Sequence, residues 1–402
     1  MIDVAIVGAG PAGAWAAYSL ATRGARVTLI DPSHPREKPC GGGVTGRALA
    51  LVANAIDLTA CAHTTIRSAR FTDALGVRGG SAATRPPDAT VPLDGDALVV
   101  ASRASFDAAL VDAAARAGAC VESARVTDVA ADAGAVRIET RAGSLRAAHV
   151  IGADGANSLV RRRVARAFRR DQLSIATGFF AHGVRSDEIV IELVADPPGY
   201  IWSFPRPDHL AIGICAQADA GITAEALRDV AAAWIERTGI ARPALIERMR
   251  IDAGARLQPY SWPIPSLAPR DFDAPALAGP RWSLVGDAAG LVDAITREGI
   301  FFALASGQWA AEALTERAAA STYSSRVHDE AIPELARAAR LRSGFFRPAF
   351  TGRMIDALQQ SGAIRAVMAD LIAGRQPYAT LKWRLLKTLE LGLAWRALVS
   401  WA

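Results

Sequence analysis

The chain has 402 residues, of which 51% are hydrophobic and 21% are charged, and its formal net charge is +5 at pH 7. This composition is too apolar for large-scale disorder, and the length is sufficient for two hydrophobic cores. No uninterrupted apolar stretch approaches the ~20 residues that a membrane span requires.

The start of the chain and its cysteines bear on the compartment in which it works. The first strand is expected to begin at Ile2, which leaves no room for a signal peptide. Four scattered cysteines lack CxxC or metal-ligand spacing: Cys40, Cys61, Cys120 and Cys215. Such cysteines fit a reducing environment better than a disulfide framework. We therefore expect a cytoplasmic protein without a metal site.

The N-terminal segment predicts a βαβ unit that binds a dinucleotide. An apolar strand over Val4–Val7 leads into three spaced glycines, and a second strand over Arg26–Ile30 ends on Asp31. The glycines permit a tight turn and let backbone N–H groups approach a pyrophosphate at a helix N-terminus. Asp31 is placed to accept hydrogen bonds from an adenosine ribose. The predicted contacts are Gly8, Gly10, Pro11, Ala12, Gly13 and Asp31.

A glycine-rich loop, KPCGGG, follows at Lys38–Gly43. Consecutive glycines let a loop pass very close to a flat ring without Cβ clashes, so we expect a side chain at Gly42 to press on a bound ring. Cys40 has two interpretations, a direct redox or proton role and a small side chain buried under the loop. Both remain open at this point.

The middle of the chain predicts mixed structure. A strand end followed by a helix is expected over Val99–Gly118, and a strand that enters the nucleotide sheet over Ala119–Val129. Four strand-like runs over Leu173–Cys215, rich in β-branched and aromatic residues, predict an antiparallel sheet. A helix over Thr223–Arg237 is expected to cover one face of that sheet.

One of these runs carries aromatic side chains at alternate positions. Tyr200, Trp202 and Phe204 share one face of the predicted strand. This spacing suits the wall of a site for a flat or elongated apolar substrate, and core packing explains it nearly as well.

A second strand-to-helix junction lies late in the chain. The strand Trp282–Val285 precedes Gly286 and Asp287, and the small residues Ala288–Gly290 predict a helix start. Such a junction suits a cofactor that extends far from the first one. FAD fits, because a carboxylate such as Asp287 can hold its ribityl hydroxyls while a helix N-terminus faces the flavin. The alternative is that Asp287 is only a helix cap.

The C-terminal region is basic, and its hydrophobic periodicity predicts helices. Residues 331–402 carry eleven Lys and Arg against four Asp and Glu, a net charge of +7. Leucines recur every four residues at Leu381, Leu385, Leu389 and Leu393. This pattern predicts either a basic amphipathic helix on the inner membrane surface or a terminal helix packed on the protein. No nucleic-acid recognition motif accompanies the basic residues, so nucleic acid is not an expected partner.

Three motifs together resemble a known superfamily. They are the glycine pattern over Val4–Asp31, GADGANS over Gly152–Ser158, and WSLVGDAAG over Trp282–Gly290. Their order and content resemble the FAD-binding signatures of the para-hydroxybenzoate-hydroxylase-like flavoproteins.

Further motifs narrow the resemblance to the geranylgeranyl reductase family. The Cys-Gly-Gly-Gly loop of Lys38–Gly43, the Tyr-x-Trp-x-Phe-Pro pattern within Gly199–Ile214, and the segment Gly286–Gly307 are similar to its marks. The resemblance covers nearly the whole chain. One departure is Arg297 before Glu298, where many relatives carry a small residue.

The resemblance implies an α/β flavoprotein fold with interleaved parts. A Rossmann-like FAD-binding domain is expected over residues 1–70, 98–170 and 276–330, an antiparallel β-sheet substrate domain over 71–97 and 171–275, and a C-terminal helical region over 331–402. Beyond the first turn, the implied cofactor contacts are Gly41, Gly42, Gly43, Arg103, Val126, Asp154, Gly286, Asp287, Gly299 and Ile300. Arg103 has the alternative of a surface salt bridge to Asp107, and Asp154 that of an ordinary turn residue.

The implied activity is the reduction of carbon–carbon double bonds in an isoprenoid chain by hydride from reduced FAD. An isolated alkene accepts hydride poorly, so an acid must lie within hydrogen-bonding reach of the substrate. The candidates are Cys40, Tyr200 and a water held by Glu298, with Trp202 beside them on the substrate wall. NAD(P)H or a ferredoxin is the expected electron source.

Two other functions remain open. A monooxygenase or halogenase-like enzyme would use the same fold on an aromatic or polyketide-type small molecule. The paired tryptophans of halogenases are not met, since Trp202 is accompanied by Tyr200. A catalytically silent flavin-binding protein is the third possibility.

Overall fold

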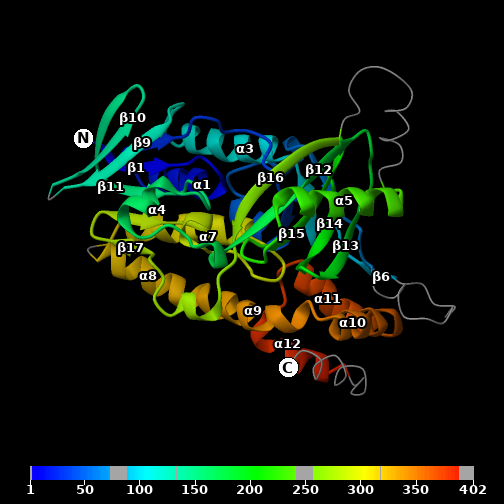
Figure 1. Ribbon diagram of the computed structural model, residues 1–402. Coiled ribbons are helices and arrows are strands. Elements are labelled where there is room, and N and C mark those ends of the chain that lie inside the picture. The colour runs from blue at the N-terminus through cyan, green and yellow to red at the C-terminus, as the bar shows by residue number, and fades with distance from the viewer. Residues whose placement is uncertain (1, 73–87, 133, 241–256, 317, 389–402) are drawn as a thin grey trace.

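The computed structural model describes residues 2–72, 88–132, 134–240, 257–316 and 318–388. Two large β-sheets lie side by side, with helices over the first sheet and a row of C-terminal helices along one side of the molecule (Figure 1). The mixed α/β class expected from the sequence is confirmed.

The first sheet contains the βαβ unit predicted from the N-terminal segment. Its parallel strands run in the order β18 (Trp282–Leu284), β11 (Gly143–Gly152), β1 (Ile2–Val7), β2 (Val27–Ile30) and β8 (Cys120–Glu122). The short strand β17 (Ala278–Gly279) adds to the β18 edge. The helix α1 (Pro11–Ala21) packs against α3 (Arg103–Arg116) and α7 (Ile300–Ala313). The buried strands and the small residues of α1 make the core of this part.

One strand expected in this sheet is divided in two. The expected strand over Ala119–Val129 becomes β8 and then β9 (Val126–Ala131), separated by a tight turn in which the Ala124 N–H donates to the Glu122 carbonyl. Strand β9 pairs with β10 (Val136–Thr140), and β10 pairs with β11, so these strands form an antiparallel extension of the sheet.

The second sheet contains the four strands predicted from the aromatic and β-branched runs. They are β12 (Leu173–His182), β13 (Glu188–Ala195), β14 (Pro198–Pro205) and β15 (His209–Gln217). The full order is β16 (Leu257–Pro265), β12, β15, β14, β13, β5 (Ser68–Thr72) and β6 (Asp88–Pro92). The four predicted strands pair antiparallel with one another, as expected, and β5, which enters from the N-terminal part, adds to the sheet parallel to β13. Residues 68–70, assigned above to the cofactor domain, therefore belong to this sheet.

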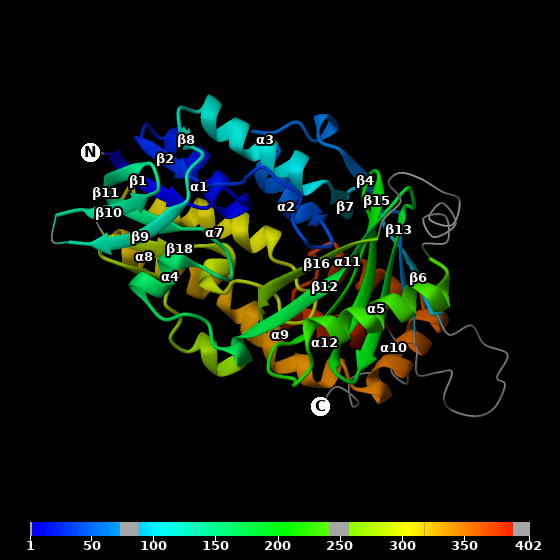
Figure 2. The ribbon, with the colours of Figure 1, turned by 45° about the horizontal axis from the view of Figure 1, so that its top comes forward.

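The predicted helix over one face of this sheet is confirmed. Helix α5 (Ala224–Thr238) lies across the strands in Figure 2 and buries Trp234 and Ile235 against them. It begins where the sequence indicates, since the Thr223 side chain accepts a hydrogen bond from the Ala226 N–H at 3.1 Å.

A small third sheet joins the two large ones. Strand β3 (Gly43–Thr45) pairs with β7 (Leu98–Ala101), which also pairs with β4 (His63–Thr65). Helix α2 (Gly46–Val52) follows β3 directly. This arrangement anchors the glycine-rich loop next to the start of α3.

The C-terminal region is helical as predicted over the part that the structure describes. Its helices are α8 (Ala319–Glu330), α9 (Ile332–Phe345), α10 (Pro348–Gln360), α11 (Gly362–Ile372) and α12 (Tyr378–Leu386). Helices α10 and α11 pack on β6, and their buried side chains form one cluster with Ile189 and Leu193 of β13. The C-terminal helices therefore close the open side of the second sheet.

Two leucines of the expected membrane-facing stripe face the protein instead. Leu381 is 5% exposed in the main core, and Leu385 packs against it, while Leu389 and Leu393 lie outside the described residues. The stripe is explained here by packing on α9. Within the described residues, none of the helices has the length and apolar character to cross a bilayer.

Candidate functional site

A long cavity runs between the two sheets and the C-terminal helices. It encloses about 1800 Å³ of space free of protein atoms, including the part open to solvent. One end is lined by backbone and charged groups of the first sheet: Gly10, Pro11, Ala12, Lys38, Ala153, Gly155 and Asp287. The other end is apolar and is lined by Phe71, Leu98, Ile189, Ile191, Leu193, Phe345, Met368, Leu371 and Ile372. The cavity therefore suits a polar cofactor at the first end and a hydrocarbon chain at the other.

The three glycines after β1 have different physical roles. Gly8 has φ of +102°, and a Cβ there would lie 2.4 Å from the Ala153 carbonyl oxygen. A Cβ on Gly13 would lie 1.9 Å from the Gly8 carbonyl oxygen. A Cβ on Gly10 would meet only His34 Nε2, at 3.9 Å, because Gly10 faces the cavity. The first and third glycines permit the fold, and the second leaves room at the N-terminus of α1 for a pyrophosphate.

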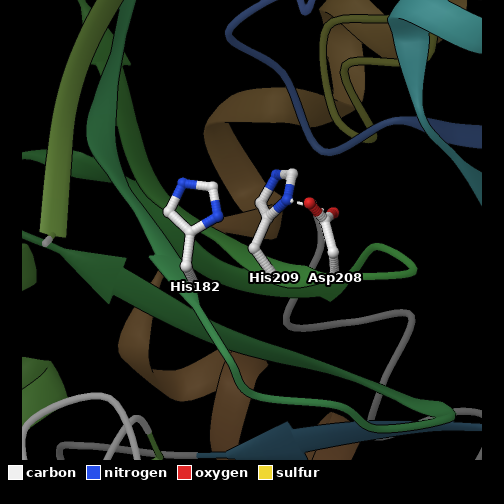
Figure 3. Close-up of side chains that lie close together, drawn as sticks. All are labelled: His182, Asp208 and His209. Carbon is white, nitrogen blue, oxygen red and sulfur yellow. Dashed lines mark hydrogen bonds and ion pairs between the residues drawn. The ribbon is translucent and has the colours of Figure 1, made fainter. Parts of the chain in front are cut away.

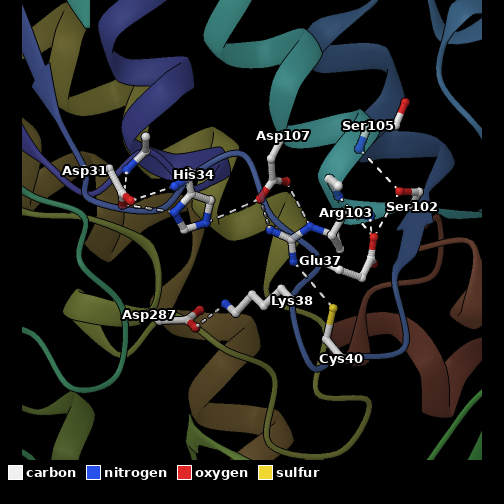
Figure 4. Close-up of polar contacts among 12 residues, drawn as sticks. Asp31, His34, Glu37, Lys38, Cys40, Ser102, Arg103, Ser105, Asp107 and Asp287 are labelled. Atoms are coloured by element: carbon white, nitrogen blue, oxygen red, sulfur yellow. Dashed lines mark hydrogen bonds and ion pairs between the residues drawn. The ribbon is translucent and has the colours of Figure 1, made fainter. Parts of the chain in front are cut away.

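Asp31 lies at the end of β2 as predicted, and its carboxylate is bound by its own chain (Figure 4). Its Oδ2 accepts hydrogen bonds from the Ala9 N–H at 3.0 Å and from His34 Nδ1 at 2.9 Å. Its Oδ1 accepts from the backbone N–H groups of Ser33 and His34, both at 2.8 Å. Burial opposes ionisation, but the hydrogen bonds led by His34 hold the pKa of Asp31 below its usual range. Asp31 therefore fixes the phosphate-binding turn, and its contact with a ribose stays a prediction.

Arg103 pairs with Asp107 as the alternative interpretation expected, although not on the surface, and its contact with a cofactor stays a prediction. It forms a two-pronged ion pair with Asp107, Nε to Oδ1 at 2.9 Å and Nη2 to Oδ2 at 2.7 Å, and it also lines the cavity. The pair is buried rather than on the surface, with side-chain exposures of 2% and 0%. Burial alone would lower the pKa of Arg103, but the Asp107 carboxylate raises it above its ordinary value. The third nitrogen, Nη1, lies 3.4 Å from the Cys40 sulfur.

The glycine-rich loop lines the cavity, but one expectation about it is wrong. A Cβ on Gly42, which has φ of +80°, would lie 2.7 Å from the Ala101 carbonyl oxygen and 3.0 Å from Arg206 Nε. A side chain at Gly42 would therefore press on the protein and not on a bound ring. Gly41 and Gly43 face the aromatic wall, since their Cβ atoms would lie 2.6 Å from Phe204 Cδ2 and 3.1 Å from Phe204 Cε2.

The buried side chain of Arg206 binds backbone carbonyl groups of this loop. Its Nη2 donates to the carbonyl oxygens of Cys40, at 2.6 Å, and Lys38, at 3.2 Å, and its Nη1 forms an ion pair with Glu37. Glu37 also accepts a hydrogen bond from the Arg103 N–H at 3.1 Å, at the start of α3. The position of Cys40 is thus set by two guanidinium groups, a feature that the sequence pattern did not reveal.

The second strand-to-helix junction differs from the prediction. After β18 the chain makes a short 3-10 turn over Gly286–Ala289 that ends on Gly290, whose φ is 83°. The helix expected to start here begins only at Ile300, after Gly299. Asp287 nevertheless lines the cavity, with its Oδ2 3.3 Å from Lys38 Nζ. Gly286, Asp287 and the start of α7 remain close to each other because the Gly286 N–H donates to Ser306 of α7 at 2.9 Å.

The candidate acids Cys40, Tyr200 and Glu298 all line the same cavity. The Tyr200 hydroxyl donates to the Thr296 carbonyl oxygen at 3.1 Å, and burial raises the pKa of Tyr200 well above its ordinary value. The Glu298 carboxylate accepts a hydrogen bond from Thr45 Oγ1 at 2.7 Å and forms an ion pair with Arg47. The role of each in proton transfer stays a prediction.

The aromatic face predicted on β14 is present. Tyr200, Trp202 and Phe204 all line the cavity, and the ring centroids of the first two lie 5.6 Å apart. Trp202 is 5% exposed, and its indole N–H has no hydrogen-bond partner among the described residues. The face thus contributes to both the core and the cavity wall.

Six predicted cofactor contacts are not among the residues that line the cavity: Gly8, Gly13, Asp31, Val126, Asp154 and Gly286. The Asp154 carboxylate accepts hydrogen bonds from the N–H groups of Leu159, at 2.6 Å, and Val160, at 3.2 Å, at the start of α4 (Leu159–Val164), and burial raises its pKa. This geometry is that of a turn and helix-capping residue. Val126 begins β9 and is absent from the cavity wall. Cofactor contacts at Asp154 and Val126 therefore stay predictions.

A group of two histidines and an aspartate lies at one end of the second sheet (Figure 3). His182 and His209 are direct partners across β12 and β15, and His209 Nδ1 lies 2.7 Å from Asp208 Oδ1. Burial lowers the pKa of His209 and favours its neutral form. The set has metal-ligating chemistry, but the Nδ1 of His209 is already bonded to Asp208 and none of the three lines the cavity.

Comparisons with known proteins agree with this geometry. The FAD binding domain family matches residues 1–225, more than half of the chain. A menaquinone reductase of Mycolicibacterium smegmatis is 30% identical over 334 residues, which are 78% of this chain and 76% of that protein. A geranylgeranyl diphosphate reductase of Rhodobacter capsulatus is 29% identical over 335 residues, 77% and 74% of the two chains.

Solved structures share the fold. A geranylgeranyl bacteriochlorophyll reductase-like protein from Thermoplasma acidophilum superposes with a TM-score of 0.75 at 22% identity, covering 96% of this chain and 99% of that one. A flavin-dependent brominase superposes with a TM-score of 0.69 at 23% identity, covering 93% of each chain. The match of sequence and fold over most of the chain shows that it belongs to the geranylgeranyl reductase family of FAD-binding flavoproteins.

Proposed function

We propose that this protein uses reduced FAD to saturate carbon–carbon double bonds in an isoprenoid chain. The observation that carries the proposal is the continuous cavity, which leads from the glycine turn at Gly10 to an apolar end walled by β13, β14 and α11. An extended hydrocarbon removes apolar surface from water along such a wall. Relatives named geranylgeranyl diphosphate reductase and menaquinone reductase support the choice of an isoprenoid.

In this proposal, different residues along the cavity bind the cofactor and donate a proton to the substrate. Backbone N–H groups at the start of α1 hold the cofactor phosphates, and Asp287, paired with Lys38, is placed for the ribityl hydroxyls. Reduced FAD supplies the hydride when it is bound. Tyr200 keeps its proton at neutral pH, but its hydroxyl already donates to the Thr296 carbonyl oxygen, so it must release that bond before it can donate to a substrate. Cys40 is the second candidate donor. NAD(P)H or a ferredoxin supplies the electrons in this proposal.

An anaerobic turnover experiment tests the reaction type. We expect that FAD-loaded protein, reduced in the absence of oxygen, transfers two hydrogens to geranylgeranyl diphosphate and that its flavin absorbance returns to the oxidised form. Mass spectrometry of the product measures the gain of hydrogen pairs. A product that gains an oxygen atom or a halogen, and forms only when oxygen is admitted, would establish the oxygenase or halogenase alternative instead.

We propose further that the protein is cytoplasmic and rests peripherally on the inner membrane, where long isoprenoids dissolve. Although Leu381 is buried, Trp383 on the same helix is 66% exposed, and Lys382 and Lys387 are exposed beside it. An exposed tryptophan among lysines suits the interface of an anionic bilayer, where each basic residue contributes about 1 kcal/mol.

Liposome sedimentation tests the contact. We expect Trp383→Ala to weaken binding to anionic liposomes at low salt, because the largest exposed apolar group of α12 is removed. Val230→Ala, which trims an exposed side chain on α5, is the matched control and should bind like the wild type. Equal binding by the wild type and Trp383→Ala would contradict a docking role for this helix.

A further inference from the structure

Two arginines from distant parts of the chain meet at one serine beside the cavity. Arg297 Nη1 donates to Ser266 Oγ, and Arg342 Nη1 donates to the same oxygen at 2.8 Å. Ser266 is fully buried, and Arg297 lines the cavity while Arg342 lies behind it on α9. Two positive guanidinium groups are therefore held next to each other by one neutral hydroxyl.

Neither of these charges has a carboxylate partner within the described ranges. No salt bridge within 4 Å joins Arg297 or Arg342 to an acidic residue there. Asp219 and Asp271 are close enough to influence Arg342, but Asp271 already accepts hydrogen bonds from Gln172, at 2.9 Å, and from Arg169, at 3.2 Å. Burial, with the charge of Arg297 beside it, lowers the pKa of Arg342 to about 10. The pair is therefore a positive site without a direct carboxylate partner among the described residues.

The backbone at Arg297 is a second, independent sign of function. Arg297 is the only described non-glycine residue with positive φ, at 59°, a conformation that favours glycine. Its Nε is buried and has no hydrogen-bond partner among the described residues. A strained residue that also keeps an unsatisfied donor persists where the surrounding structure uses its side chain.

We propose that Arg297 binds the phosphate-type headgroup of the substrate, with Arg342 adding a second positive charge through the shared Ser266. A guanidinium group can donate two parallel hydrogen bonds to two oxygens of one phosphate. A bound anion would also reduce the electrostatic repulsion between the two arginines. The identity of the apolar tail rests on the proposed function; the anion site does not. Tyr200, whose hydroxyl binds the backbone next to Arg297 at Thr296, connects this site to the aromatic wall.

Calorimetric titration of the FAD-saturated full-length protein tests the site, because bound FAD blocks its own phosphate site. The probes are inorganic pyrophosphate, which represents a prenyl diphosphate, and glycerol phosphate, which represents a phospholipid headgroup. We expect Arg297→Gln to weaken binding of the preferred probe by about tenfold or more, in line with loss of a charge-assisted pair. Arg340→Gln, an exposed arginine on α9, is the matched control and should bind like the wild type.

Arg342 is tested as a positioning residue. Arg342→Gln should weaken binding less than Arg297→Gln does, and Arg342→Lys, which keeps the charge, should restore most of the affinity. Arg297→Gly removes the side chain at a backbone position that favours glycine, so it supplies a folded variant if Arg297→Gln is unstable.

The outcomes separate this site from the proposed function. Pyrophosphate binding that depends on Arg297, in a protein that reduces no isoprenoid, would keep the anion site and reject the reductase. Stronger binding of glycerol phosphate than of pyrophosphate would identify a phospholipid headgroup as the source. The anion site is overturned if neither probe binds the wild type, or if both bind Arg297→Gln and Arg297→Gly as tightly as the wild type.

Discussion

Gly10→Val is expected to abolish FAD binding and to leave the protein folded. A Cβ on Gly10 would meet nothing of the protein closer than 3.9 Å, so the added side chain projects into the cavity at the N-terminus of α1. It would occupy the space and block the backbone N–H groups that a pyrophosphate requires. We expect FAD affinity to fall by about 100-fold or more, equivalent to about 2.8 kcal/mol. Flavin absorbance of the purified protein and FAD titration measure the loss, and circular dichroism reports the fold.

Gly13→Val is the matched comparison, only three residues away. Its Cβ would lie 1.9 Å from the Gly8 carbonyl oxygen, inside the turn itself, so this variant should lose the fold together with the flavin. The contrast distinguishes a glycine kept for the ligand from a glycine kept for packing. If Gly10→Val purified with a full complement of FAD, the pyrophosphate would have to lie elsewhere.

The parts of the fold that depend on local pattern were predictable from the sequence. The helix α5 begins after Thr223 because a threonine cap and an early acidic residue favour a helix start. The strands β12 to β15 follow the β-branched and aromatic runs for a similar local reason. The cavity-facing positions Gly10 and Tyr200 were identified because a glycine turn and an alternating strand each determine their own geometry.

The predictions that failed, and the residues that were missed, depend on contacts between distant segments of the chain. The helix start expected at Ala288 is absent because Gly290 adopts a left-handed conformation, where a Cβ would lie 2.9 Å from Leu267. His34 was missed because its neighbours Asp31 and Asp107 belong to different elements. Arg342 was missed for the same reason, since no local pattern relates α9 to Ser266. The departure at Arg297 was the one sequence signal that pointed toward this region.

Asp107→Ala is expected to cause a large loss of stability. It would leave the Arg103 side chain, which is 2% exposed, without its bidentate partner, and the Cys40 sulfur at 3.4 Å would be its nearest remaining contact among those described. Removal of one member of a buried ion pair costs about 3–5 kcal/mol, because the remaining charge cannot regain its hydration. Urea denaturation of the flavin-free protein measures the change in the free energy of unfolding.

Two further variants distinguish the destabilisation caused by an unpaired buried charge from that caused by lost packing. The double variant Arg103→Met with Asp107→Leu removes both charges at similar volume, so it should recover most of the lost stability. Asp3→Ala breaks the exposed pair with Arg26, where β1 and β2 begin, and should leave the unfolding midpoint almost unchanged. A double variant as unstable as Asp107→Ala would show that shape, and not charge, is what the pair contributes. In that case, because Arg103 also lines the cavity and approaches Cys40, the double variant's affinity for FAD would report the contribution of the arginine to the cofactor site separately from its contribution to the fold.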